Sequence, residues 1–291
     1  MPSKPIDRPQ RLRRSLLSVP AINRRALEKS VSLDCDGIIF DLEDSVAADS
    51  KAEARDNLYQ LLQHADLKGR EAIIRINGSD SPWFSEDLAL VASIGPDAVL
   101  LPKTERLNEL AALRAGAGEK PALWAMIETP KAVLDVARLA GEGAGLGLEC
   151  LVVGLNDLRK ETRVPAAPGR TFLVPWLMQV VLAARAYNLD VIDAVFNDFR
   201  DLEAFEDECS QGRSMGFDGK MLIHPAQIDA SNRQFGPSEA EISEARAIVA
   251  AFAAPEASGL NVINHTGQMI ERLHAEQAER LLSRLSLLPH P

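Results

Sequence analysis

Residues 122–128 read Ala-Leu-Trp-Ala-Met-Ile-Glu, an unbroken apolar run that ends in an acidic residue. A strand of a parallel sheet has this continuous apolar character, because helices cover both faces of the sheet. Seven similar runs occur along the chain, and most of them also end in a polar or charged residue. The eight runs are Ser15–Val19, Gly37–Glu43, Ala72–Asn77, Ala98–Lys103, Ala122–Glu128, Leu151–Asp157, Val191–Phe196 and Met221–His224.

The segments between these runs place apolar residues three and four positions apart, as a helix with one buried face requires. Repeated strand–helix units predict an α/β fold, a closed (β/α)₈ TIM barrel over residues 1–236. The alternative is an open dinucleotide-binding sheet, which is disfavoured because no Gly-x-Gly-x-x-Gly follows the first run. The predicted helices are Ala21–Ser32, Lys51–His64, Ser85–Ile94, Glu105–Gly116, Thr129–Leu139, Trp176–Tyr187 and Asp201–Met215.

A barrel closes without the last part of the chain, residues 237–291. Here the pattern predicts a helix over Ser238–Ala253, a short strand-like run over Gly259–Ile263 and a final helix over Glu271–Leu285. We expect this C-terminal helical extension to pack on a neighbouring subunit, and capping of the bottom of the barrel is the alternative.

The composition is that of a globular protein, with 46% hydrophobic and 25% charged residues in 291. The net charge of −10 argues against sequence-independent binding of nucleic acid, which needs clustered cations. No run approaches the about 18 apolar residues of a membrane span, and no signal peptide is recognisable. The three cysteines match neither a disulfide framework nor a zinc site. We therefore expect a cytoplasmic protein that contacts neither nucleic acid nor membranes.

Two acidic run ends predict a metal site. Glu128 ends the fifth run and Asp157 the sixth, and the carboxyl ends of neighbouring barrel strands meet at the end that carries the active site. Mg²⁺ prefers hard oxygen ligands and keeps part of its hydration shell. The pair therefore predicts a Mg²⁺ site, with Mn²⁺ as the alternative ion. The alternative role for either acid is to cap the helix that follows it.

The second run ends in the acidic stretch Asp41-Leu42-Glu43-Asp44. We expect Glu43 and Asp44 to support catalysis by holding metal-bound water, and capping or fixing the loop is the alternative for Asp44. Arg75, near the end of the third run, is expected to bind a substrate carboxylate through two parallel hydrogen bonds. An internal ion pair with Glu43 is the alternative for Arg75.

Other basic residues are also candidates for contacts with anions. Lys103 ends the fourth run, and we expect it to bind an anionic group of the substrate rather than to form a Schiff base, because the surrounding acids favour its charged form. The basic stretch Arg8–Arg14 is interpreted as a solvated arm. Contact with an anionic ligand is the alternative, which makes Arg14 a candidate substrate-binding residue. Lys220 lies at the start of the eighth strand, at the end opposite the active site, and His224 is expected to anchor a loop.

Seven motifs then connect the chain with a known family. They are Arg14-Ser15-Leu16-Leu17 with Val19-Pro20, Phe40-Asp41-Leu42-Glu43-Asp44, Arg75-Ile76-Asn77, Leu101-Pro102-Lys103, Ile127-Glu128-Thr129, Gly154-Leu155-Asn156-Asp157-Leu158, and Gly216-Phe217-Asp218-Gly219-Lys220 with Ile223-His224-Pro225. In these motifs, from about Arg14 to the C-terminal helix, the chain resembles the citrate lyase β-subunit (CitE-like) branch of the HpcH/HpaI aldolase family.

The resemblance implies a Mg²⁺-dependent lyase on a (β/α)₈ barrel, acting on acyl-CoA or acyl-carrier-protein thioesters and assembled as a homotrimer or a multiple of three. It implies that Glu128 and Asp157 bind the metal and that Arg75 contacts the substrate carboxylate. It also implies that Glu43 gives polar support. Glu128 is a substrate-binding candidate as well as a metal ligand.

One segment departs from the pattern of the malyl-CoA lyase-like relatives. Those carry Gly-x-Met-x-Asp near the C-terminus, with the Asp reaching into the neighbouring subunit's site, whereas Gly267–Glu271 ends here in Glu. Glu271 is therefore the candidate general acid that donates a proton to the thioester enolate formed by cleavage.

The reaction that the resemblance implies is cleavage of a citryl-, malyl- or citramalyl-type 3-hydroxyacyl thioester into a 2-oxo acid and an acyl thioester. Two alternatives stay open. One is a divalent-metal aldolase that releases pyruvate from 2-keto-4-hydroxy acids. The other is a weakly catalytic scaffold that binds a thioester.

Overall fold

The computed structural model describes residues 11–166, 168–265, 267–285 and 287. Arg13–Phe235 form one compact unit, and the chain from Gly236 onward belongs to a second unit. None of the helices within the described ranges is long and apolar enough to span a lipid bilayer.

The first unit is a closed barrel of eight parallel strands in chain order, so the predicted (β/α)₈ barrel is confirmed. Each strand pairs with its neighbours in sequence, and β1 closes the barrel by pairing with β8. The strands are β1 (Ser15–Pro20), β2 (Gly37–Asp41), β3 (Glu71–Arg75), β4 (Ala98–Leu101), β5 (Ala122–Ile127), β6 (Leu148–Val153), β7 (Asp190–Asp193) and β8 (Gly219–Leu222).

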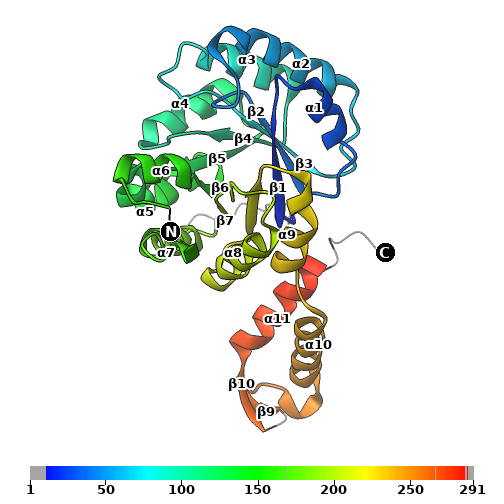
Figure 1. The fold of residues 1–291 in the computed structure, drawn as a ribbon. Coiled ribbons are helices and arrows are strands. Elements are labelled where there is room, and N and C mark those ends of the chain that lie inside the picture. Colours follow the sequence, from blue (N-terminus) through cyan, green and yellow to red (C-terminus); the bar gives the residue numbers. More distant parts are fainter. Residues whose placement is uncertain (1–10, 167, 266, 286, 288–291) are drawn as a thin grey trace. The chain divides into compact units, whose positions relative to one another are not determined.

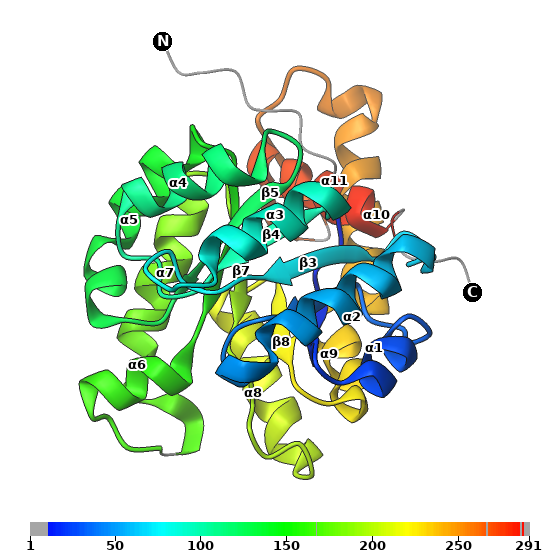
Figure 2. The same ribbon diagram turned by 90° about the horizontal axis from the view of Figure 1, so that it is seen from above.

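Helices follow the strands and surround the barrel (Figures 1 and 2). They are α1 (Arg24–Ser30), α2 (Lys51–His64), α3 (Phe84–Ile94), α4 (Leu107–Ala117), α5 (Pro130–Ala144), α6 (Leu155–Thr162), α7 (Val174–Ala186), α8 (Leu202–Met215) and α9 (Ile228–Phe235). Short 3₁₀ turns occupy Ala48–Ser50, Pro168–Arg170 and Pro225–Gln227.

The apolar core of the barrel has two layers, because successive side chains of a strand point to opposite faces. In β2, Ile39 belongs to an inner cluster made only of strand residues, with Trp124 and Met126 of β5. Its neighbours Ile38 and Phe40 belong to the outer cluster, which also includes helix residues. The barrel interior is therefore filled with side chains.

A charged group closes the amino-terminal end of the barrel. Arg13 donates to both carboxylate oxygens of Glu71 at 2.7 and 2.8 Å and to Asp190 at 2.6 Å, and its guanidinium lies 4.8 Å from the centre of the Trp124 ring. Glu71 and Asp190 are the first residues of β3 and β7. This end is sealed, so the carboxyl ends of the strands form the mouth of the barrel.

The prediction was wrong about where the sixth strand ends. The run Leu151–Asp157 was expected to be one strand, but β6 ends at Val153 and α6 begins at Leu155. The apolar character continues across Gly154, which is the N-cap residue of α6, so the change from strand to helix leaves no hydropathy signal. Asp157 consequently lies in the first turn of a helix rather than at a strand end.

The second unit contains α10 (Glu239–Ala253), a hairpin of β9 (Val262–His265) and β10 (Gln268–Glu271), and α11 (Arg272–Leu285). A capping box formed by Ser238 and Glu241 begins α10. The sequence predicted one short strand here and missed the second, because most of β10 falls between the predicted strand Gly259–Ile263 and the predicted helix that begins at Glu271. Phe252, Ile270 and Ala275 form a small core of this unit.

Candidate active site

Five of the residues that line the mouth of the barrel form a compact ionic group, which we name the mouth cluster. Its members are Asp41, Glu43, Arg75, Lys103 and Glu128. They come from the carboxyl ends of β2, β3, β4 and β5 or from the residues directly after them. Four of the five were predicted as site residues, and the structure brings these four together.

Arg75 is held by two acids. Its Nε and Nη2 donate to the two carboxylate oxygens of Asp41, each at 2.7 Å, and its Nη1 lies 3.3 Å from Glu43 Oε2. The predicted alternative of an internal ion pair with Glu43 is therefore present, but the bidentate partner is Asp41. Sequence reasoning left Asp41 out of the site. The sequence carried only part of the signal: the predicted runs place Asp41 and Arg75 near the ends of neighbouring strands, but the register that sets them opposite each other comes from the structure.

Both carboxylate oxygens of Asp41 accept two hydrogen bonds each. Besides Arg75, it accepts the backbone N–H groups of Glu43 at 2.9 Å and Ser45 at 3.2 Å. Burial alone would raise the pKa of this carboxyl, but the charge and hydrogen bonds of Arg75 bring the pKa below its usual range. Asp41 therefore stays ionised and fixes both Arg75 and the loop that carries Glu43.

Lys103 links the acids of β2 to Glu128. Its Nζ donates to Glu43 Oε1 at 2.7 Å and lies 3.6 Å from Asp44, while its backbone N–H donates to Glu128 Oε1 at 2.8 Å. The backbone of Lys103 has φ +48°, a left-handed conformation that is rare for a side-chain-bearing residue and typical of functional sites. Burial alone would lower the pKa of Lys103, but the hydrogen bond to Glu43 and the charge of Glu43 outweigh burial and raise the pKa above its usual value. Lys103 therefore stays charged.

Glu128 is a buried carboxyl in an anionic environment. Burial raises its pKa, the charges of Glu43 and Asp157 raise it further, and together they bring the pKa to about 8. Gly154 makes room for it, because a Cβ at Gly154 would lie 2.4 Å from Glu128 Oε2. A cation near Glu128 would lower this pKa and stabilise the ionised form.

The residues present suit a divalent metal such as Mg²⁺. Glu128 and the half-buried Asp157 supply hard carboxylate oxygens, and Asp157 is close enough to raise the pKa of Glu128. Glu43 Oε2 is a buried oxygen that accepts no hydrogen bond. Across the described part of the chain, no three His, Cys, Asp or Glu side chains converge into a metal-binding group. Two carboxylates therefore need water or substrate oxygens to complete a coordination shell, as Mg²⁺ sites in proteins usually do.

Arg14, Asp44 and Glu271 are predicted site residues that are not members of the mouth cluster. Arg14 precedes β1, at the sealed end, and its guanidinium forms two hydrogen bonds with Asp36 at 2.7 and 2.8 Å. The placement of Arg14 in the substrate site is therefore corrected: a residue that directly precedes a parallel strand lies at the opposite end of the barrel. Asp44 is exposed and has only the longer contact to Lys103. Glu271 ends β10 in the second unit.

His224 and Lys220 have structural partners. His224 Nδ1 accepts the backbone N–H of Ala226 at 3.1 Å and so anchors the turn after β8, as predicted. Lys220 belongs to a second buried ionic group on the outer side of β7 and β8, the flank cluster, which is made up of Arg170, Asp193, Glu208 and Lys220.

The flank cluster has equal numbers of acids and bases. Asp193 accepts from Arg170 Nη1 at 2.7 Å and from Lys220 Nζ at 3.0 Å, and Glu208 accepts from Lys220 at 2.8 Å. Burial alone would raise the pKa of Asp193, but Lys220 and Arg170 bring the pKa below its usual range. Each buried charge is therefore compensated.

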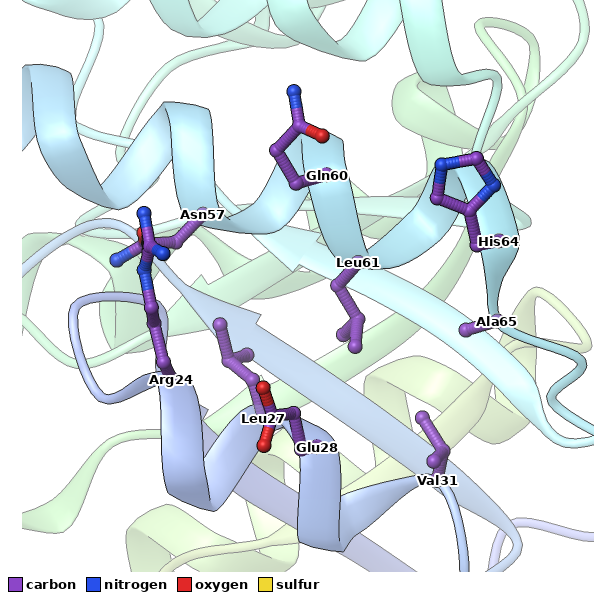
Figure 3. Close-up of a pocket in the computed structure, with 9 residues that line it drawn as sticks. All are labelled: Arg24, Leu27, Glu28, Val31, Asn57, Gln60, Leu61, His64 and Ala65. Carbon is purple, nitrogen blue, oxygen red and sulfur yellow. Dashed lines mark hydrogen bonds between the residues drawn. The ribbon is translucent and has the colours of Figure 1, made fainter.

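Two cavities lie outside the mouth cluster. One of about 370 Å³ lies between α1 and α2 (Figure 3), with Arg24 toward one end and His64 toward the other, and no predicted site residue lines it. The other, of about 580 Å³, lies between α6 and α8. Leu155 and Val195 line this second cavity, and Val195 also packs against the inner core of the barrel.

Comparison with known proteins assigns the family. The family model HpcH/HpaI aldolase/citrate lyase matches residues 14–225. The chain belongs to the HpcH/HpaI aldolase/citrate lyase family. The family predicted from the sequence motifs is confirmed, as is the prediction of an enzyme from a family of lyases.

Named relatives match nearly the whole chain. A (3S)-malyl-CoA thioesterase of Cereibacter sphaeroides (strain KD131 / KCTC 12085) is 44% identical over 271 residues, covering 93% of this chain and 94% of the relative. The citrate lyase subunit beta of Escherichia coli (strain K12) is 33% identical, with 97% and 96% covered. The crystal structure of CitE from Mycobacterium tuberculosis with magnesium, acetoacetate and coenzyme A matches with a TM-score of 0.77 and 25% identity, over 94% of this chain and 97% of that one.

Proposed function

We propose that this protein is a Mg²⁺-dependent lyase that cleaves a 3-hydroxyacyl-CoA of the malyl type into a 2-oxo acid and an acyl-CoA. The observation that carries the proposal is the surplus of carboxylates at the mouth. Within the described residues, four acids at the mouth, Asp41, Glu43, Glu128 and Asp157, meet two cations, Arg75 and Lys103, and the further pair of Asp44 and Lys51 leaves this difference unchanged. A bound divalent cation would balance this surplus, and the named relatives act on, or are bound to, CoA compounds or citrate.

The residues of the chain have separate roles in this proposal. Glu128 and Asp157 would hold Mg²⁺, which supplies a Lewis acid for the hydroxyl and carboxylate oxygens of the substrate. Arg75, oriented by Asp41, binds the substrate carboxylate with its Nη1 edge. Lys103 stays protonated and adds positive charge beside the developing oxyanion. The substrate hydroxyl loses its proton as its oxygen becomes the carbonyl of the 2-oxo acid, and the electron pair of the broken carbon–carbon bond passes to the thioester α-carbon. That carbon then takes up one proton, which balances the proton lost by the hydroxyl.

We propose Glu271 of a neighbouring copy as the donor of that proton, in a homotrimer or a multiple of three. Glu271→Gln keeps the shape of the side chain but removes the acid, so kcat should fall about 10²- to 10⁴-fold with a smaller change in KM. Steady-state kinetics measure this split, and Glu276→Gln on the exposed surface of α11 serves as the matched control. Normal turnover of the Glu271 variant would assign the proton to another group. Light scattering on the purified protein tests the subunit number.

Hydrolysis of the thioester is the second candidate function. It is favoured by the four relatives of 42–44% identity, which are named (3S)-malyl-CoA thioesterase. Both reactions begin with the same carboxylate, hydroxyl and thioester groups in the site, so the products distinguish them.

A product assay tests both candidates. The purified protein is incubated with Mg²⁺ and (3S)-malyl-CoA, glyoxylate is trapped as its phenylhydrazone, and free CoA is measured with a thiol reagent. The lyase proposal expects glyoxylate and acetyl-CoA without free thiol. Free thiol and malate without glyoxylate would contradict it in favour of hydrolysis. A parallel reaction with a 2-keto-4-hydroxy acid tests the aldolase alternative, and binding without products from any substrate would indicate the scaffold.

A further inference from the structure

Lys51 is a buried lysine next to the active site that the proposed reaction does not use. It is the first residue of α2, and only 5% of its surface is exposed. Its Nζ donates three hydrogen bonds: to the carbonyl of Leu42 at 2.7 Å, the carbonyl of Glu43 at 2.8 Å and Asn77 Oδ1 at 2.7 Å. An ammonium group has three N–H donors, so all of them are used.

The position of this charge is unfavourable for the helix itself. The amino-terminal end of a helix carries a partial positive charge, which disfavours a lysine there. All three acceptors are neutral oxygens, and the Trp83 ring, 5.1 Å away, lies under the ammonium. Burial lowers the pKa of Lys51. Burying this charge costs free energy, so we infer that the hydrogen bonds of Lys51 have a function in fixing the backbone of Leu42 and Glu43.

That backbone carries the centre of the mouth cluster. Glu43 lies between the two cations of the cluster, with Oε1 on Lys103 and Oε2 near Arg75. Its carbonyl and that of Leu42 are the two that Lys51 binds. Asn77 also donates to the Leu42 carbonyl at 3.1 Å, so this carbonyl accepts hydrogen bonds from both Lys51 and Asn77.

A second layer keeps this arrangement rigid. Asn77 donates its side-chain N–H at 2.6 Å and its backbone N–H at 2.8 Å to Asp87 Oδ2. Asp87 is fully buried, and its other oxygen accepts from Arg55 at 3.1 Å. These bonds fix the orientation of the Asn77 side chain, so its Oδ1 points toward Lys51 Nζ.

We propose that Lys51 is a positioning residue of the active site, which holds the Leu42–Glu43 backbone so that the Glu43 carboxylate orients Arg75 and Lys103. Lys51 touches none of the reacting atoms and acts only through Glu43. The role in catalysis rests on the proposed function, whereas the hold on the backbone does not.

Amide hydrogen exchange tests the hold on the backbone without any substrate. The N–H groups of Glu43 and Ser45 are bonded to Asp41 and report the position of the loop. Lys51→Met keeps the apolar stem and removes the ammonium, and we expect at least tenfold faster exchange at these two amides. Lys29→Met, on the exposed face of α1, is the matched control and should leave them unchanged. Asn77→Ala is a second variant that keeps the ammonium of Lys51 but removes one of its acceptors, together with the Asn77 side-chain hydrogen bonds to Leu42 and Asp87.

A double-mutant cycle tests the role in catalysis. Lys51→Met should lower kcat/KM at least tenfold in the wild-type background but less than threefold when Glu43 is already Gln, because the two residues act as a unit. A lysine that only stabilises the fold would give the same factor in both backgrounds.

The outcomes separate the two proposals. Unchanged exchange at Glu43 and Ser45 in both variants, or equal factors in the cycle, would overturn the positioning role. Faster exchange in Lys51→Met, combined with a wild-type protein that neither cleaves nor hydrolyses any thioester, would support the role of Lys51 in fixing the backbone and would contradict the proposed function.

Discussion

The mouth cluster and the flank cluster belong to the same barrel and use the same residue types, yet their charge balance differs. In the flank cluster two acids face two bases, and the pKa of the buried Asp193 is lowered. In the mouth cluster three acids face two bases, and Asp157 adds a further negative charge; burial, together with these negative charges, raises the pKa of Glu128 to about 8. A balanced cluster stabilises the fold, whereas an unbalanced one is suited to bind a cation.

The largest expected effect comes from removing the charge of Glu128. Glu128→Gln keeps the acceptor for the Lys103 N–H and should lower kcat at least about 10³-fold, because metal-assisted charge stabilisation is worth several kcal/mol. Steady-state kinetics of the Mg²⁺-dependent reaction measure it. Urea unfolding should show no loss of stability in this variant. Unchanged turnover would remove Glu128 from the metal site.

The opposite result is expected in the flank cluster. Asp193→Asn leaves Arg170 and Lys220 with one acid, and breaking such a buried pair costs about 3–5 kcal/mol of unfolding free energy. Urea unfolding measures the loss. The kcat/KM of the folded protein should stay within about threefold of wild type, because independent sites act additively. An Asp193→Asn variant that is as stable as the wild type but inactive would contradict the assignment of the flank cluster to stability and of the mouth cluster to catalysis.

The pH dependence of stability should also have opposite signs. In metal-free protein, the raised pKa of Glu128 means that the folded state binds the proton more tightly than the unfolded state. The contribution of Glu128 to the free energy of unfolding therefore falls as pH rises from 4.5 to about 8. The lowered pKa of Asp193 gives a contribution that is complete above pH 3.8 and is lost as pH falls below it. Urea midpoints of the wild type, Glu128→Gln and Asp193→Asn across pH measure both effects. A Glu128 variant with the same slope as wild type above pH 4.5 would contradict this assignment.

A smaller effect is expected from crowding the metal site. Gly154→Ala places a methyl group against Glu128 Oε2, and displacement of a metal-binding carboxylate should lower the apparent Mg²⁺ affinity about tenfold. Gly145→Ala is the matched control, because the nearest atom to its Cβ would be 3.4 Å away. The Mg²⁺ dependence of the reaction rate gives both affinities, and equal values would show that Gly154 does not shape the site.

Local patterns predicted the strands and the acids at their ends. Glu128 follows an unbroken apolar run, so both its strand and its place at the mouth could be read from the sequence. Asp157 was predicted at the end of a strand but lies in the first turn of α6, because the apolar Leu155 after Gly154 extended the predicted run past the true end of β6. Arg14 was misplaced because its candidacy rested on the charge of the stretch Arg8–Arg14 and not on its position directly before the first strand.

Contacts between distant residues could not be derived in this way. The bidentate pair of Asp41 and Arg75 spans 34 positions, and the hydrogen-bond partners of Lys51 lie on two segments, Leu42–Glu43 and Asn77. Which carboxylate each cation selects depends on side-chain packing, which hydropathy patterns do not encode. The balance of charge that separates the two clusters was therefore visible only in the structure.

Calorimetric titration of metal-free protein with Mg²⁺ tests the central claim most directly, with wild type compared with Glu128→Gln, Asp157→Asn and Asp193→Asn. The account predicts binding of Mg²⁺ by the wild type and by Asp193→Asn, and loss of that binding in both mouth variants. Equal Mg²⁺ affinity in the wild type, Glu128→Gln and Asp157→Asn would contradict it.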